Sequence, residues 1–257
     1  MTLAVTVEDL SPKVLERCIS NSRSRTDLWI EFIRAIDARQ MVEVGVYQGD
    51  FAEVVLQRCD SVAKYYMVDP WKHLDDWNKP SNQDDAKFED FFRITKAKTD
   101  FAASRRVILR GKTTDVIDEI GDREVDFAYI DGDHTLKGIA IDLVRVFPKV
   151  KVGGYIGGDD FTPTMWQHKT QFEPTLVFPF AVYFAEAVGA TIYALPYSQF
   201  CLHKSGQSNF NFVDLTGQYK DLGLRTQVAP GRLLKLSLSE RFPRFTQVLR
   251  RAKRFIP

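Results

Sequence analysis

The sequence predicts an α/β fold in which a doubly wound, mostly parallel β-sheet is covered by helices on both faces. From Met41 onward, apolar runs of strand length alternate with stretches of helical length. Parallel strands need crossover connections, and this alternation supplies them. A chain of 257 residues with 44% hydrophobic content can also fill a core of the size that such a sheet requires.

Each element follows from its local pattern. An N-terminal helical cover is expected from two helices, at 11–19 and 26–36, the second capped by Thr26 or Asp27. The strands are expected at 41–46, 63–69, 106–110, 125–131, 154–159 and 191–196. The helices between them are expected at 51–59, 114–120, 136–147 and 179–189.

We divide the chain into an N-terminal extension (1–25), a ligand-binding domain (26–204) and a C-terminal extension (205–257). The segment 71–105 is longer than an ordinary connection and contains a helix at 84–99, so we expect a lid over the ligand face; a plain surface helix is the alternative. The tail from Arg241 predicts a basic amphipathic helix. Such a helix docks on its own domain or on a sister subunit in a homo-oligomer, or binds a membrane surface or another anionic partner.

Composition excludes several classes of protein. The net charge of +1 provides no global attraction for nucleic acid. Three cysteines without a CxxC pair argue against a disulfide framework and against a zinc–thiolate site. The N-terminus has no signal-peptide pattern and the chain has no apolar stretch of about 18 residues, so we expect a cytoplasmic protein without a transmembrane segment.

Ligands of such sheets bind at the carboxyl ends of the strands. The first strand ends in "VEVGVYQGDF", where Gly45 and Gly49 let the backbone approach a ligand and Glu43 lies just before them. A dinucleotide fingerprint would need G-x-G-x-x-G, but Tyr47 and Asp50 occupy the second and third glycine positions. The stretch therefore disfavours a nicotinamide dehydrogenase, and an ordinary turn is the alternative.

The next two strand ends favour a nucleoside. Asp69 lies 24 residues after Gly45, where an acid can accept hydrogen bonds from ribose hydroxyls. Gly111, Lys112 and Thr113 follow the third strand and could line an adenine edge. The alternative for this stretch is that a threonine only caps the next helix.

Acidic residues follow two further strands. Asp131 ends one, and Asp159 and Asp160 end the other, so they converge if the two strands are neighbours. Three such carboxylates repel one another unless a cation neutralises them. Oxygen ligands alone suggest a hard ion, Mg²⁺ before Ca²⁺ or Mn²⁺.

Two residues of the "DGDH" stretch have competing interpretations. His134 lies three residues beyond Asp131, beside the expected metal, where an imidazole can act as a general base. The alternative is a solvated histidine in the first turn of a helix. Asp133 is predicted to be the N-cap of that helix rather than a ligand.

The motifs "EVGVYQGDF", "MVDPW", "VDFAYIDGDHT" and "GGYIGGDDF" together resemble class I S-adenosylmethionine-dependent methyltransferases. They are most similar to the metal-dependent branch that contains the macrolide sugar O-methyltransferases of the macrocin and mycinamicin type. Catechol O-methyltransferase is a more distant relative of the same plan. The resemblance covers 26–204, and it implies the Rossmann-like methyltransferase fold with S-adenosyl-L-methionine and Mg²⁺ as cofactors.

The resemblance also implies roles for individual residues. Bulky residues such as Tyr47 occur in this branch, although the superfamily consensus is rich in glycine at that point. Asp131 is expected among the cofactor contacts, the metal ligands and the catalytic residues. The cofactor contacts would be Glu43, Gly45, Tyr47, Gly49, Asp69, Gly111, Lys112, Thr113 and Asp131. The metal ligands would be Asp131, Asp159 and Asp160, and the catalytic residues His134 and Asp131.

The expected function is therefore a Mg²⁺-dependent O-methyltransferase that acts on a hydroxyl of a small molecule, a sugar or glycoside. One alternative is a metal-independent methyltransferase in which the carboxylates only orient the substrate. The other is a non-catalytic nucleoside-binding module with a basic tail. Further candidate substrate contacts are Trp71, His73, Trp77, Trp166 and His168.

Overall fold

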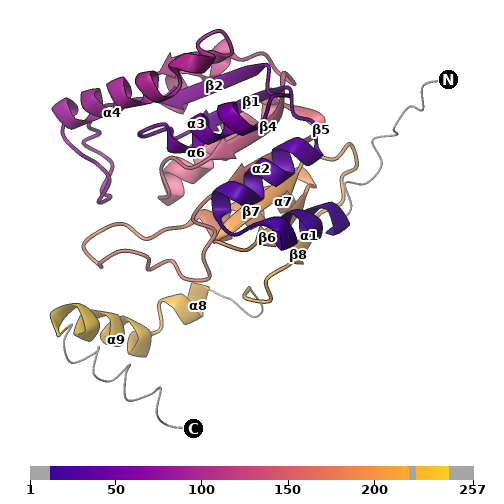
Figure 1. The fold of residues 1–257 in the computed structure, drawn as a ribbon. Coiled ribbons are helices and arrows are strands. Elements are labelled where there is room, and N and C mark those ends of the chain that lie inside the picture. The colour runs from indigo at the N-terminus through magenta and orange to yellow at the C-terminus, as the bar shows by residue number, and fades with distance from the viewer. Residues whose placement is uncertain (1–11, 220–223, 243–257) are drawn as a thin grey trace.

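The computed structural model describes residues 12–219 and 224–242, and these form a sheet between layers of helices (Figure 1). The sheet has the strand order β3-β2-β1-β4-β5-β7-β6-β8. β1 to β5 are parallel, β7 runs antiparallel to β5 and β6, and β8 is parallel to β6. The strands are β1 Gln40–Val44, β2 Lys64–Asp69, β3 Arg106–Arg110, β4 Val125–Ile130, β5 Val150–Gly158, β6 Thr191–Leu195, β7 Gln199–His203 and β8 Asn211–Asp214.

The described helices lie mostly between consecutive strands, as the alternating pattern predicts. The α-helices are α1 Pro12–Asn21, α2 Arg25–Ala35, α3 Asp50–Arg58, α4 Asp85–Lys98, α5 Thr113–Val116, α6 Leu136–Val146, α7 Val177–Val188, α8 Leu224–Gln227 and α9 Pro230–Arg241. Three short 3₁₀ helices complete the set, at Asp100–Ala102, Ile117–Glu119 and Phe147–Lys149. None of the helices in the described ranges is both long enough and apolar enough to cross a membrane.

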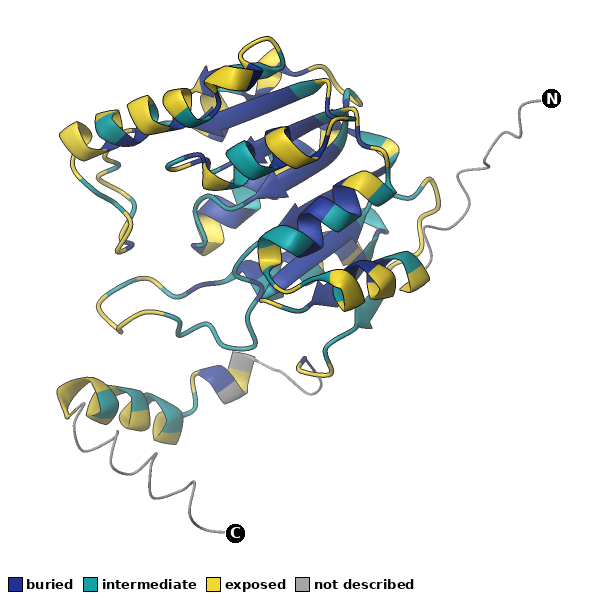
Figure 2. Cartoon of the chain, viewed as in Figure 1, coloured by how far each residue is buried: buried dark blue, intermediate teal, exposed yellow. Residues whose placement is uncertain are grey.

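The two faces of the sheet are packed into separate hydrophobic cores. Successive residues of a strand point to opposite faces. In β4, Phe127 and Tyr129 belong to the core under α1, α2, α3 and α4, whereas Ala128 and Ile130 belong to the core under α6 and α7. Figure 2 shows the strands dark blue between these helices, because a sheet covered on both faces buries nearly all of its side chains.

All six predicted strands and the predicted helices between them are present, with ends shifted by a few residues. The sheet is larger than predicted, because β7 lies between β5 and β6 and β8 extends the sheet beyond β6. β8 lies beyond residue 204, the predicted end of the ligand-binding domain. The predicted boundaries themselves stay predictions.

The predicted caps of α2 were wrong. The helix begins at Arg25, and its N-cap is Ser24, whose hydroxyl accepts a hydrogen bond from the backbone N–H of Asp27 at 3.1 Å. Ser24 also donates from that hydroxyl to the Asp27 carboxylate, at 3.0 Å. The predicted cap residue Asp27 therefore lies in the first turn, where an acid is favoured by the helix dipole.

The C-terminal helices lie apart from the sheet (Figure 1). α9 buries none of its side chains. It contacts the loop after β5 through Glu240, which accepts hydrogen bonds from the Thr170 backbone and hydroxyl. The predicted basic amphipathic helix falls mainly on residues 243–257, which lie outside the described residues.

The register of the sheet positions the site. Val44, Ile130 and Gly158 are partners across β1, β4 and β5, so these three strands end at the same level. The residues that follow them therefore come out side by side at one edge of the sheet. This edge is the switch point between β1 and β4, from which the strand order runs in opposite directions along the chain.

Packing at this point predicts that Gly157→Ala destabilises the protein. A Cβ atom at Gly157 would lie 2.4 Å from the ring of Trp29, which is fully buried on the inner face of α2. The rigid indole cannot yield, so we expect a loss of about 1–3 kcal/mol in the free energy of unfolding, measured by urea denaturation. Gly206→Ala is the matched control, since its Cβ would meet only Val152 at 3.4 Å. Equal stabilities of the two variants would contradict this packing argument.

Candidate active site

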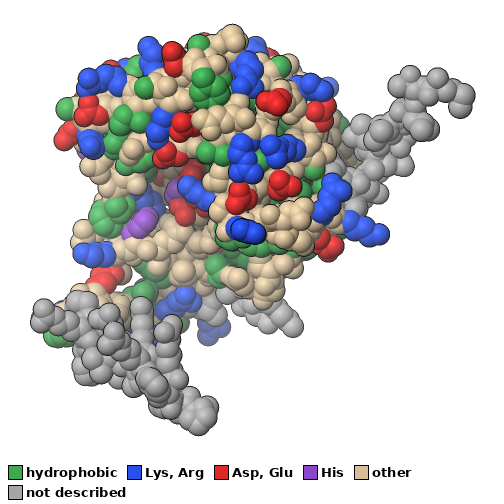
Figure 3. Space-filling model, in the orientation of Figure 1, with side chains coloured by type: hydrophobic (Ala, Val, Ile, Leu, Met, Phe, Trp, Pro, Cys, Tyr) green, Lys and Arg blue, Asp and Glu red, His purple; other side chains and the backbone are tan. Residues whose placement is uncertain are grey.

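A cavity of about 440 Å³ opens at the carboxyl ends of β1, β2 and β4. On the face shown in Figure 3, acidic, basic and histidine side chains gather around a hollow. Gly49, Asp159 and Asp160 are not among the residues that line the cavity. The predicted site residues that do line it are Glu43, Gly45, Tyr47, Asp69, Gly111, Lys112, Thr113, Asp131 and His134.

The loops after β1 and β4 lie directly against each other at the base of this cavity. Asp131 donates its backbone N–H to the Val44 carbonyl at 2.8 Å. Gly45 has a φ of +88°, and a Cβ atom there would lie 2.2 Å from the carbonyl oxygen of Asp131. Only glycine fits such a backbone conformation at such a distance, so Gly45 is what allows the two loops to meet.

Asp69 is held by backbone N–H groups at the end of β2. Its carboxylate accepts hydrogen bonds from Tyr47 at 2.9 Å and from Trp71 at 2.7 Å. Burial raises the pKa of Asp69 to about 6, although these N–H groups oppose the rise. The remaining lone pairs of the carboxylate can accept hydroxyl donors from a ligand.

Two further acids line the cavity with raised pKa values. Burial raises the pKa of Glu43 well above its usual range, and the hydroxyl of Tyr65 donates to Glu43 at 2.7 Å. Burial also raises the pKa of Asp142, to about 7, and the hydroxyl of Thr113 donates to it at 2.6 Å. Lys112 is the N-cap residue of α5, so the alternative that a threonine only caps this helix was wrong.

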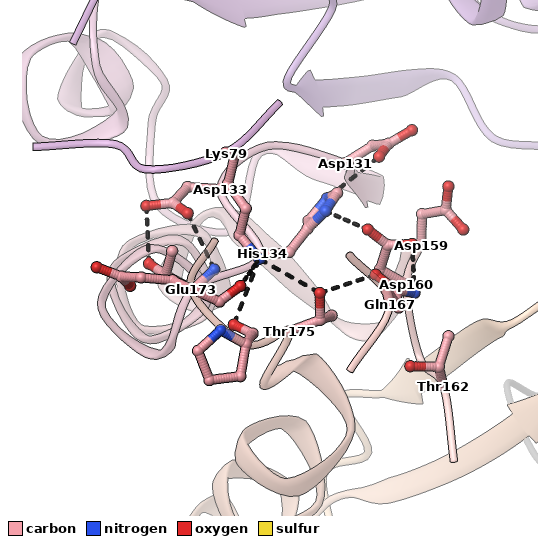
Figure 4. Close-up of polar contacts among 12 residues, drawn as sticks. Lys79, Asp131, Asp133, His134, Asp159, Asp160, Thr162, Gln167, Glu173 and Thr175 are labelled. Carbon is pink, nitrogen blue, oxygen red and sulfur yellow. Dashed lines mark hydrogen bonds and ion pairs between the residues drawn. The ribbon is translucent and has the colours of Figure 1, made fainter. Parts of the chain in front are cut away.

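His134 lies between two carboxylates (Figure 4). Its Nε2 is 3.3 Å from Asp131, and its Nδ1 forms an ion pair with Asp160. Burial lowers the pKa of His134, but the two carboxylates outweigh burial and raise it to about 10. In this arrangement the ring is protonated near neutral pH.

Arg25 brings a second positive charge to the acidic residues. Its Nη1 lies 3.3 Å from an oxygen of Asp131 and forms an ion pair with Asp159. The other oxygen of Asp159 accepts a hydrogen bond from the side-chain amide of Gln199. β4 and β5 are adjacent and parallel, so the sequence prediction that these acids converge is confirmed.

These residues do not fit a bound Mg²⁺ ion. A magnesium site needs near-octahedral oxygen ligands, and a cation bound between Asp131 and Asp159 would displace the guanidinium of Arg25. The oxygens of Asp160 are engaged by His134 and by Gln167, which donates at 2.9 Å. Within 12–219 and 224–242, no group of three or more His, Cys, Asp or Glu side chains is arranged to hold a metal ion.

The prediction that Asp133 caps α6 was wrong. The N-cap is Thr135, whose hydroxyl accepts a hydrogen bond from Gly138 N–H at 3.1 Å. Asp133 instead accepts from the backbone and the hydroxyl of Thr135, both at 2.9 Å. The helix begins at Leu136, and Asp133 fixes the cap residue Thr135 rather than the helix itself.

Two loops meet beside the cavity. The buried Nζ of Lys79 donates to the Glu173 carbonyl at 2.9 Å and to the Thr175 hydroxyl at 3.3 Å (Figure 4). Burial lowers the pKa of Lys79. Trp77 from one loop and His168 from the other line the cavity.

The remaining candidate substrate contacts lie away from this cavity. Trp71 is buried in the core, and its indole N–H donates to the carbonyl of Tyr47 at 2.7 Å. Trp166 donates its indole N–H to the carbonyl of Gln227 at 3.0 Å. His73 lines a second pocket beside the site.

Sequence reasoning missed Arg25, Lys79, Asp142 and Gln199. Arg25 is 106 residues from Asp131 and is the last residue of the predicted N-terminal extension. Gln199 lies in a strand that was not predicted. Asp142 is the one member with a usable signal, because an acid on the apolar face of a helix is unusual unless it meets a polar partner.

Residues 42–161 match the sequence model of the Methyltransf_24 family, which is described as a methyltransferase domain. The match begins in β1 and ends just after Asp160, so it spans the strand ends that form the site. A comparison with curated protein sequences finds no significant match.

Solved structures share the fold at low sequence identity. A candidate caffeoyl-CoA O-methyltransferase of Staphylococcus aureus has a TM-score of 0.53 at 13% identity, covering 76% of this chain and 91% of that one. A Corynebacterium glutamicum protein has a TM-score of 0.52 at 12% identity, and the match covers 78% of this chain and 93% of that one. An SAH-bound methyltransferase of Podospora anserina has a TM-score of 0.51 at 12% identity, and the match covers 75% of this chain and 86% of that one. The family match indicates a methyltransferase domain in residues 42–161, and the solved structures share the fold of this chain.

Proposed function

We propose that this enzyme transfers a methyl group from S-adenosylmethionine to a hydroxyl oxygen of a small molecule, with sugars and glycosides as the substrate class. One observation carries the proposal: residues suited to a nucleoside line the same cavity as Asp131 and His134. Asp69 and Gly45 lie on its cofactor side, and Asp131 and His134 lie where the substrate would enter.

The cofactor side fits S-adenosylmethionine. Because Gly45 has no side chain, a ligand can approach the backbone of this loop closely. Asp69 offers a carboxylate to the ribose hydroxyls. Thr113 and Asp142 supply polar groups farther along the cavity, on the side expected for adenine. When bound, S-adenosylmethionine supplies a methyl group on a cationic sulfonium.

The substrate side offers a group for proton removal. His134 Nδ1 is engaged by Asp160, whereas the buried Nε2 makes no well-aligned hydrogen bond. Nε2 is therefore the ring atom that can face a substrate hydroxyl, with Asp131 beside it at 3.3 Å. To act as a general base, His134 first has to release the proton that the two carboxylates hold on it. Trp77 and His168 can contact the body of the substrate.

Dependence on Mg²⁺ is expected from the three carboxylates and from the family resemblance. The contacts of Arg25 with Asp131 and Asp159 favour the metal-independent alternative. Activity that is lost with EDTA and restored by Mg²⁺ would favour the metal-dependent enzyme.

The proposed function predicts methyl transfer to hydroxylated small molecules. We expect S-adenosylmethionine with a labelled methyl group to label at least one member of a panel of sugars, glycosides and catechols. Calorimetry with S-adenosylmethionine and S-adenosylhomocysteine tests binding separately. If the cofactor binds but no member of a broad panel is labelled, the non-catalytic nucleoside-binding module is the better description.

His134→Ala is expected to reduce turnover by about 10²–10⁴-fold, the range that a general base contributes. The affinity for S-adenosylhomocysteine serves as the control and should stay within about threefold of wild type, because His134 lies on the substrate side. Turnover close to that of wild type would mean that another group removes the proton.

The pKa of Asp69 predicts how cofactor binding depends on pH. The carboxylate is charged above about pH 6 and neutral below it, and only the charged form accepts both ribose hydroxyls well. We therefore expect the affinity for S-adenosylhomocysteine, measured by calorimetry, to fall by up to about tenfold per pH unit below that pKa.

Asp69→Asn is the control for this dependence. The loss of a charged acceptor should weaken binding at pH 7 by about ten- to hundredfold and remove the dependence on pH. A pH profile that is the same in wild type and in Asp69→Asn would show that another group titrates.

A further inference from the structure

We infer that Arg25 is the resident cation of the acidic cluster, so that its guanidinium holds the substrate-side carboxylates in place and the site works without a divalent metal ion. This inference deepens the proposed function and rests on it for the catalytic part. It concerns a positioning residue that comes from outside the segment 42–161 that matches the methyltransferase family.

The first argument is the set of contacts of Arg25. Its Nη1 contacts one oxygen of Asp131 and one oxygen of Asp159, which come from the ends of two different strands. A metal ion bound to these two oxygens would have to displace the guanidinium. Arginine stays charged at every pH that a protein tolerates, so this positive charge is permanent.

The second argument is that all six carboxylate oxygens of the cluster have partners within the protein. Arg25 accounts for one oxygen each of Asp131 and Asp159, and His134 for one oxygen each of Asp131 and Asp160. The two oxygens that remain accept hydrogen bonds from the amides of Gln199 and Gln167. Each of the six oxygens therefore already has a partner in the protein.

The third argument is that α2 is built to deliver this arginine. Arg25 is its first residue, and the buried face of the helix is packed against the sheet. From the same face, the indole N–H of Trp29 donates at 2.7 Å to the side-chain oxygen of Gln199, whose amide holds Asp159. α2 therefore holds Asp159 in two ways. Arg25 contacts Asp159 directly, and Trp29 positions Gln199, which donates a hydrogen bond to Asp159.

Arg25 also lines the cavity, and its side chain is 48% exposed. Substitution at this position should therefore leave the core intact. The guanidinium can fix Asp131 beside His134 and still face the substrate. Arg23 provides a matched control, because it is exposed, carries the same charge and has no ion pair among the described residues.

The test compares wild type and variants in their affinity for Mn²⁺, a paramagnetic substitute for Mg²⁺. Binding is measured by titration followed with electron paramagnetic resonance. We expect wild type and Arg23→Ala to bind Mn²⁺ only weakly. Arg25→Ala and Arg25→Gln free the oxygens of Asp131 and Asp159, so they should bind it at least about tenfold more tightly. Arg25→Lys keeps the charge and should still exclude the ion, and Arg25→Ala combined with Asp159→Asn should lose the gained site.

Activity supplies a second readout. Turnover of wild type should change by less than about twofold with EDTA, whereas Arg25→Ala should lose about tenfold or more and regain part of it with Mg²⁺. Thermal unfolding of each variant checks that it is folded, and Arg25→Gln replaces Arg25→Ala if the latter is not.

Two results would overturn the inference. One is stoichiometric Mn²⁺ binding by wild type that Asp159→Asn abolishes, and the other is the absence of Mn²⁺ binding in both Arg25→Ala and Arg25→Gln. If no variant transfers a methyl group under any condition, the proposed function fails, and the Mn²⁺ titrations still decide the role of Arg25.

Discussion

The crowding of three carboxylates at the ends of β4 and β5 is the constraint on which the site depends. Asp131, Asp159 and Asp160 follow strands that are adjacent and parallel, so the fold forces them together. Their repulsion would favour protonation or displacement unless positive charge lay beside them. Arg25 from α2 and His134 from the loop after β4 supply that charge. The first part of the chain is thereby tied to the central strands.

The same strand ends connect the two halves of the cavity. The carbonyl of Asp131 lies against Gly45, whereas its side chain lies between Arg25 and His134. One residue therefore borders the loop expected to bind the cofactor and the cluster expected to bind the substrate. This arrangement can align a hydroxyl oxygen with a cofactor methyl group, because both binding loops are fixed by the register of β1 and β4.

Local patterns predicted most of the sheet but missed β7, which lies inside it, and β8, which lies at its edge. β1 to β6 were predicted because their apolar runs are separated by helices of sufficient length. β7 was missed because only a tight turn separates it from β6. Tyr197 and Ser198 form this turn, and both have positive φ values. Without a longer break in the sequence, β7 cannot be told apart from the end of β6. β8 was missed because its side chains are half-buried or exposed, which leaves no apolar run to detect.

The candidate site divides in the same way. Gly45, Asp69, Asp131, His134 and Thr113 were predicted because each follows a strand directly, and they line one cavity. The caps of α2 and α6 were placed on the wrong residues, since several cap-forming side chains stand close together there and only the backbone geometry selects among them.

By itself, the sequence determined the alternation of strands and helices and the polar residues that follow each strand, because both are properties of neighbouring residues. Only the tertiary structure decided that Arg25 lies among the acids. That contact joins residues 106 positions apart and depends on how the apolar face of α2 packs on the sheet. Gln199 and Lys79 belong to the same group, because their partners are brought to them by strand pairing and loop contact, which no local pattern records.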